Sequence, residues 1–240
     1  MTKRAGRSRS GVGPAVAGSF NPLSLGPTVW LKADLGTGQT VDGASVTTWS
    51  DQSGNSNNAT GSGTPPVYKT NVQNGLPVVR GSGLGPFFTL PSLASLTVAT
   101  VVIVVRSIDN GVSTNKDGLW AIGTSANETL FPYVTNTIYD DFGTNSRKTT
   151  VSPPTSLGVF NVYEVQTAAG AWTSWLNGTQ LYTTASNTVA FSATPLLFKA
   201  NSTGNTFDGD LGELLLYPTA LSTANRQAVE AYLKAKWATP

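Results

Sequence analysis

The segment GDLGELLLYPTALSTANRQAVEAYLKAKW (residues 209–237) joins a strand pattern directly to a helix pattern. DLGELLLY (210–217) is an apolar run that ends at Pro218, which predicts a strand. Beyond the proline, Ser222 is a suitable N-cap for a helix. The spacing i, i+3, i+4, i+7 then predicts an amphipathic helix over about 222–237, carried by Val229, Tyr232, Leu233, Lys236 and Trp237.

Short β-rich runs between Gly, Pro and Asn clusters fill the chain from about residue 21 up to this segment. The run TVATVVIVVRS (97–107) is nearly continuous in valine, which is typical of a central strand covered on both faces. Many strands followed by one helix predict an all-β fold, an antiparallel two-sheet jelly-roll sandwich with a short C-terminal helix.

The clearest local pattern is AWTSWLNGTQLYTT (171–184). Its Asn-Gly pair predicts a type I′ turn, because both central residues need a positive φ. Pairing across that turn places Trp175 opposite Gln180. Strict alternation then puts Tyr182 on the same face as Trp175, and Trp172 on the other face.

The composition excludes several kinds of active site. The 240 residues include no cysteine and no histidine, so disulfides, thiolate metal sites, histidine zinc sites and Ser-His-Asp triads are absent. Hydrophobic residues make up 39% and charged residues 12%, which is too apolar for a disordered chain.

The net charge of +2 is unevenly distributed. Residues 1–20 are predicted to be a basic, flexible arm, and residues 21–240 the sandwich domain. Four of the 15 basic residues lie in the arm, so the rest of the chain has 11 basic and 13 acidic residues, a net charge of about −2 and no nucleic-acid footprint. The four are Lys3, Arg4, Arg7 and Arg9.

The arm lacks the apolar core of a signal peptide, and the apolar run 97–105 is too short to span a bilayer. We therefore expect synthesis in a cytoplasm and no membrane partner.

Several segments, in this order along residues 27–237, resemble the laminin-G-like, or concanavalin A-like, jelly-roll family. They are VWLKAD (29–34), WSDQSGNSNNAT (49–60), NGLPVVRG (74–81), the valine-rich run, WLNGTQL (175–181) and the segment 209–237. The resemblance implies the sandwich fold. It leaves function open, because the family includes lectins, adhesive domains, β-glucanases and virion proteins.

Two candidate ligand sites are visible. Trp175, with Gln180 and Tyr182, could form an aromatic platform for a glycan. Asp51, Ser53 and Asn55 fall at positions 1, 3 and 5 of an EF-hand-like loop, but no glycine or glutamate occupies positions 6 and 12. We expect no cofactor, with calcium at this loop as the alternative.

The run FDGDLGE (207–213) is reminiscent of the carboxylate strand of β-glucanases in the same superfamily. Asp208, Asp210 and Glu213 could serve as its acids. The competing interpretation is a turn leading into a strand with a locally bonded glutamate. We favour the second interpretation because spacing alone shows no catalytic geometry.

The main prediction is a non-enzymatic virion structural protein of a tailed phage. It would be a capsid decoration or tail-associated subunit located in the virion, with the arm binding capsid or tail proteins, and it would be a homo-oligomer or part of a larger assembly. The alternative is a carbohydrate-binding adhesin that recognises a host-surface glycan. A glycoside hydrolase is ranked third.

Overall fold

The computed structural model describes residues 20–83, 85–108, 117–127, 129–133, 136–150, 153–200 and 205–240. Residues 1–19 of the predicted arm, which include its four basic residues, lie outside this part of the chain. Within it, no helix is both long and apolar enough to cross a membrane.

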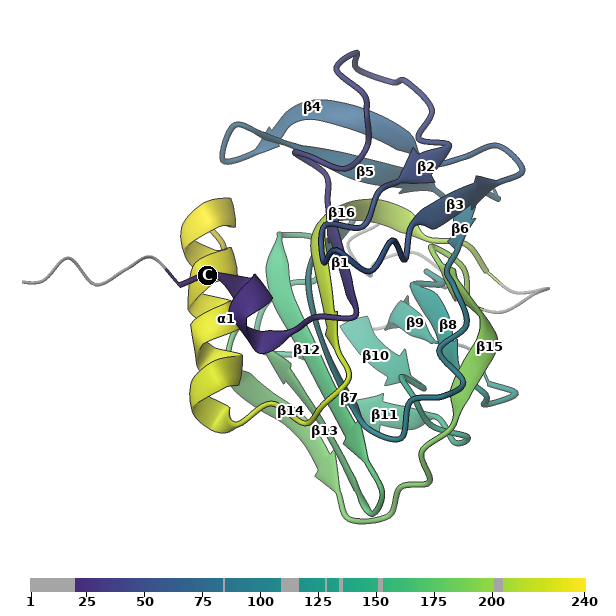
Figure 1. The fold of residues 1–240 in the computed structure, drawn as a ribbon, viewed down its shortest axis with the longest axis vertical. Coiled ribbons are helices and arrows are strands. Elements are labelled where there is room, and N and C mark those ends of the chain that lie inside the picture. The colour runs from purple at the N-terminus through teal and green to yellow at the C-terminus, as the bar shows by residue number, and fades with distance from the viewer. Residues whose placement is uncertain are drawn as a thin grey trace, which may run out of the picture.

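Two antiparallel sheets form the sandwich, which confirms the predicted fold class (Figure 1). The large sheet has eight strands in the order β14-β13-β12-β7-β16-β5-β4, with β1 also paired to β16. The second sheet has five strands in the order β2-β3-β6-β15-β8. A small sheet of three strands, β11-β10-β9, was not predicted.

The large sheet comprises β1 (Val29–Lys32), β4 (Val67–Gln73), β5 (Leu76–Ser82), β7 (Ala99–Ser107), β12 (Asn161–Ala168), β13 (Ala171–Leu176), β14 (Thr179–Thr184) and β16 (Asp208–Tyr217). The five-stranded sheet comprises β2 (Thr48–Trp49), β3 (Ala59–Ser62), β6 (Phe87–Thr89), β8 (Trp120–Gly123) and β15 (Phe191–Leu197). The small sheet comprises β9 (Leu130–Tyr133), β10 (Thr137–Asp140) and β11 (Lys148–Thr150). The helices are the 3₁₀ turn η1 (Pro22–Leu25) and α1 (Thr223–Trp237).

The valine-rich strand β7 lies in the middle of the large sheet, between β12 and β16. Residues 101–105 of this strand are fully buried, as predicted for a strand covered on both faces. On the inner side, aromatic side chains connect the sheets: Trp120 of β8 stacks on Tyr163 of β12 with ring centroids 6.1 Å apart. On the outer side, helix α1 covers the large sheet (Figure 1).

Helix α1 begins where the sequence predicts, and its Ser222 hydroxyl accepts a hydrogen bond from the backbone N–H of Asn225 at 3.2 Å. Val229, Leu233 and Trp237 are fully buried against the sheet. Gly212 of β16 is required beneath the helix, because a Cβ there would lie 2.7 Å from the Trp237 ring.

The buried carboxylate of Glu213 anchors this helix to the sheet. One oxygen accepts hydrogen bonds from Trp30 Nε1 at 2.6 Å and from the Tyr232 hydroxyl at 3.1 Å. The other accepts from Lys236 Nζ at 2.6 Å and Trp237 Nε1 at 3.0 Å. Glu213 is 0% exposed, so its charge depends on these donors for the solvation that it has lost.

Glu213→Ala should lower the free energy of unfolding by roughly 3–5 kcal/mol, because it leaves buried donors and an ammonium group without their acceptor. Asp34→Ala is the matched control, since Asp34 pairs with the same Lys236 at 2.9 Å but is partly exposed. The control should cost only about 0.2–1 kcal/mol. Equal losses for the two variants in urea unfolding would contradict the anchoring role of Glu213.

Candidate functional site

The predicted calcium loop is closed by its own hydrogen bonds. The Asp51 carboxylate accepts from the backbone N–H groups of Trp30 (2.8 Å), Ser53 (2.9 Å) and Asn57 (3.0 Å), and from the Ser53 hydroxyl at 2.6 Å. Asn55 points its amide nitrogen at the carbonyl oxygen of Thr28, 3.2 Å away. A metal ion would have to compete with these donors for the Asp51 oxygens.

Within the described ranges, no group of three or more acidic, histidine or cysteine side chains could hold a metal ion. Through the hydrogen bonds described above, the Asp51 loop connects the start of β1 to the segment that follows β2. The expectation of no cofactor and the alternative of calcium at this loop both stay untested.

The predicted Trp175 platform is only partly assembled. The turn has the expected geometry, with φ of 50° at Asn177 and 83° at Gly178, and Trp175 pairs with Gln180. A β-bulge follows, however, because Ser174 pairs with Tyr182. The extra residue in β14 reverses the alternation.

The prediction that Tyr182 shares the face of Trp175 is therefore wrong. Tyr182 lies on the inner side of the sheet, edge-on to the buried Trp172 with centroids 5.9 Å apart. Trp175 faces outward, where the Arg226 guanidinium of helix α1 lies 4.5 Å from its ring centroid. The helix thus occupies a ring face that a sugar would need.

Arg226 also forms an ion pair with Glu164 of β12, at 2.7 Å from Nη1 to Oε2. Glu164 is fully buried, and its other oxygen, Oε1, has no hydrogen-bond partner within the described chain. Burial raises the pKa of Glu164 to about 7, although hydrogen bonding to Arg226 acts in the opposite direction. This arrangement belongs to the helix–sheet contact.

Two of the three predicted hydrolase acids are engaged in structural pairs. Asp210 is fully buried between two arginines, with its oxygens 2.6 Å from Arg80 Nε and 2.8 Å from Arg106 Nε. Glu213 is the helix anchor described above. Asp208 is half-buried at the start of β16. The competing interpretation is wrong in its details: Asp208 and Gly209 belong to β16 rather than to a turn, and the partners of Glu213 are distant in the sequence rather than local. The carboxylates of Asp210 and Glu213 are engaged by these distant partners.

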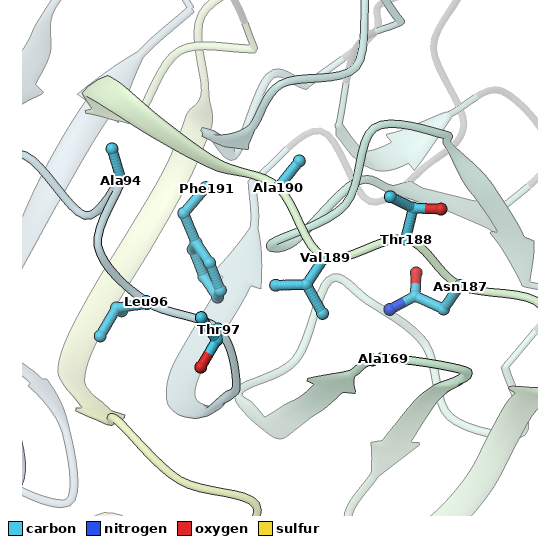
Figure 2. Close-up of a pocket in the computed structure, with 9 residues that line it drawn as sticks. All are labelled: Ala94, Leu96, Thr97, Ala169, Asn187, Thr188, Val189, Ala190 and Phe191. Atoms are coloured by element: carbon cyan, nitrogen blue, oxygen red, sulfur yellow. The ribbon is translucent and has the colours of Figure 1, made fainter.

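A pocket of about 610 Å³ opens at one end of the sandwich (Figure 2). Three segments far apart in the sequence line it: the loop before β7, the β12–β13 turn, and the segment that leads into β15. Leu96, Val189 and Phe191 form much of the apolar wall, and Thr97, Thr188 and Asn187 contribute the polar groups.

The Asn187 amide has a fixed orientation. Its nitrogen donates to Thr167 Oγ1 at 2.9 Å and to the Ala168 carbonyl at 2.8 Å. Its oxygen, Oδ1, is buried and has no partner within the described chain. A buried acceptor without a donor costs on the order of 1–3 kcal/mol. Because solvent does not reach this oxygen, a ligand hydroxyl could bond to it only if the surrounding groups moved.

Sequence reasoning missed this pocket, because nothing in the spacing of residues 94–97, 169 and 187–191 indicates that they meet.

No protein-family model and no curated protein matches this sequence. Solved structures do match. One is domain 4 of AbnA, a GH43 extracellular arabinanase from Geobacillus stearothermophilus, in complex with arabinotriose. It is 16% identical, the match covers 85% of this chain and 97% of that chain, and the TM-score is 0.59.

A second is Trypanosoma rangeli sialidase in complex with sialic acid, with 12% identity, 88% of this chain and 33% of that chain covered, and a TM-score of 0.59. A third is the receptor-binding domain of botulinum neurotoxin mosaic serotype C/D. It is 11% identical, the match covers 88% of this chain and 51% of that chain, and the TM-score is 0.63. This chain thus spans about a third of the sialidase and half of the neurotoxin domain.

These matches confirm a β-sandwich, jelly-roll-like fold. They overturn the prediction of a non-enzymatic protein, because chains of glycoside hydrolases, a sialidase and an arabinanase, share the fold. The three structures include neither a laminin-G domain nor a phage protein, so the finer family assignment and the virion role stay predictions.

Asp51→Ala should lower the free energy of unfolding by about 3 kcal/mol, because buried and half-buried backbone donors lose a charged acceptor. The melting temperature of the unmodified protein should be the same in EDTA as in millimolar calcium. Asp42→Ala, which removes an exposed carboxylate bonded to Lys69, is the control and should have a much smaller effect. If EDTA lowered the melting temperature of the unmodified protein to that of the Asp51 variant, the carboxylate would act as a metal ligand and not only as a hydrogen-bond acceptor within the loop.

Glu164 should make stability depend on pH. Since its pKa is about 7 in the folded chain against an ordinary value of 4.5, the folded state holds the proton more tightly. Stability therefore falls as the pH rises from about 4.5 to about 7. Glu164→Gln removes this dependence. As the pH rises from about 4.5 to about 7, the free energy of unfolding of the variant should therefore increase by roughly 3 kcal/mol relative to that of the unmodified protein. A difference that stays constant with pH in denaturant titrations would show that the carboxyl ionises normally.

Proposed function

We propose that this chain is a carbohydrate-binding β-sandwich module that holds a saccharide in the pocket of Figure 2. The observation that carries the proposal is the likeness, over 97% of its length, to an arabinanase domain whose structure contains arabinotriose. The likeness to a sialidase solved with sialic acid supports the same class of ligand.

The chemistry of the pocket suits a saccharide. Sugar rings have an apolar C–H face and a rim of hydroxyls, so they need an apolar wall beside a few fixed polar groups. Leu96 and Val189 supply such a wall, and the exposed side chains of Thr97 and Thr188 supply hydroxyls beside it. The volume of about 610 Å³ lies within the range of roughly 300–1,000 Å³ usual for small-ligand pockets.

Helix α1 covers the outer face of the large sheet, and this also favours the pocket over the Trp175 platform as the saccharide site. Arg226 lies over the Trp175 ring, and Tyr182 is on the opposite face of the hairpin. A glycan at Trp175 would have to displace an arginine that is also paired with a buried carboxylate. Gln180 remains exposed and accessible beside it.

The setting of this binding, on a phage virion attached through residues 1–20, stays a prediction. Residues 1–19 of this arm lie outside the described chain.

Arabinotriose and a panel of neutral oligosaccharides should be titrated calorimetrically against the full chain and two variants. Ala94→Trp fills the pocket from an exposed position, and should weaken binding at least tenfold, or about 1.4 kcal/mol. Ala231→Trp, at an exposed position of helix α1, is the matched control and should bind normally. Absence of binding to every saccharide, or equal binding by both variants, would overturn the proposal.

A further inference from the structure

A row of two tyrosines and one arginine crosses the small sheet. Tyr133 of β9 and Tyr139 of β10 stack with ring centroids 4.5 Å apart and planes inclined by 23°. The guanidinium carbon of Arg147, in the turn between β10 and β11, lies 4.1 Å from the Tyr139 centroid. The three side chains thus form one continuous row.

The row lies on the solvent side of the small sheet. Along β10, Ile138 and Asp140 are fully buried, so the alternating Tyr139 points the other way. Thr149, the partner of Tyr139 on β11, is exposed. All three side chains of the row are partly exposed, so a ligand can reach them.

Arg147 keeps its charge available. Within the described residues it forms no ion pair within 4.0 Å, unlike Arg80, Arg106 and Arg226, which all hold buried carboxylates. The acid that acts on it at longer range is Asp141, and burial raises the pKa of that carboxyl well above its ordinary value. Arg147 thus has no directly paired carboxylate among the described residues.

Contact with the Tyr139 ring also restricts where the guanidinium can lie. An arginine whose plane is held by an aromatic ring loses less conformational entropy when it binds than a freely rotating side chain does. Its N–H fork matches the two oxygens of a carboxylate. The neighbouring tyrosine rings provide faces and edges that suit the C–H groups of a sugar.

We propose that the Tyr133–Tyr139–Arg147 row is a second saccharide-binding surface, specific for a sugar that carries a carboxylate. Arg147 binds the carboxylate, and the tyrosines contact the sugar ring. The inference rests on the proposed function for the class of ligand, and it adds a site and a charge requirement that the pocket of Figure 2 does not have.

An extended polyanion such as nucleic acid fits less well. Outside the arm, the chain has 11 basic and 13 acidic residues, so its overall potential does not favour long phosphate chains. One arginine beside two tyrosines matches a single acidic group on an otherwise neutral ligand.

The test compares tri-galacturonic acid with its fully methyl-esterified form, titrated against the full chain by calorimetry. The unmodified protein should bind the acid at least tenfold more tightly than the ester. Arg147→Gln should abolish this preference, and Arg147→Lys, which keeps the charge but loses the fork, should retain only part of it.

Lys32→Gln is the matched control. Lys32 is also a partly exposed cation over an aromatic ring, 4.8 Å from the Trp30 centroid, and its loss changes the net charge equally. It should leave the preference intact, and thermal melting of all variants should match that of the unmodified protein because no ion pair is removed.

Each other outcome overturns the inference. If the acid and the ester bind equally and Ala94→Trp still weakens binding, the carboxylate site is wrong and the saccharide-binding proposal survives. If no saccharide binds at all, both fail. A preference that persists in Arg147→Gln places the acid elsewhere, and tighter binding of a single-stranded oligothymidylate, lost in Arg147→Gln, assigns the row to phosphate.

Discussion

The buried carboxylate of Glu213 holds the two ends of the fold together. It lies in the closing strand β16, accepts a hydrogen bond from Trp30 of the first strand, and accepts three more from helix α1. Because the carboxylate has no contact with solvent, none of these donors can be lost without leaving charge or polarity buried. The helix is therefore fixed on the outer face of the large sheet.

This closure decides where a ligand can bind. With α1 over the outer face and the five-stranded sheet over the inner face, the large sheet offers little open surface around Trp175. The end of the sandwich remains, where three separate segments line the pocket (Figure 2). The solvent side of the small sheet also remains open. Neither location uses the Asp51 loop, whose polar groups hydrogen-bond within the loop and to β1.

Local patterns predicted the parts of this structure that depend on short-range physics. The helix after Pro218, the Asn177-Gly178 turn and the buried strand at residues 97–107 follow from capping, positive φ and continuous β-branched residues. The face of Tyr182 was predicted wrongly, because a single bulged residue reverses alternation and strict two-residue periodicity cannot anticipate it.

Sites that depend on distant segments were not predictable in this way. The pocket brings together residues 94–97, 169 and 187–191, and the Tyr–Arg row depends on the pairing of β9, β10 and β11. The spacing of the acids in residues 208–213 is compatible with a catalytic set. Their partners, Arg80, Arg106 and Trp30, come from elsewhere in the chain and show what Asp210 and Glu213 do.

The end of the sandwich is the proposed saccharide-binding site. The most direct measurement is a two-dimensional NMR titration of the ¹⁵N-labelled chain with arabinotriose, following every assigned backbone amide. The account predicts saturable shifts concentrated at residues 94–97, 169–170 and 187–191, with the Asp51 loop and helix α1 unaffected. No saturable shifts, or shifts centred on Trp175 or the Asp51 loop, would contradict it.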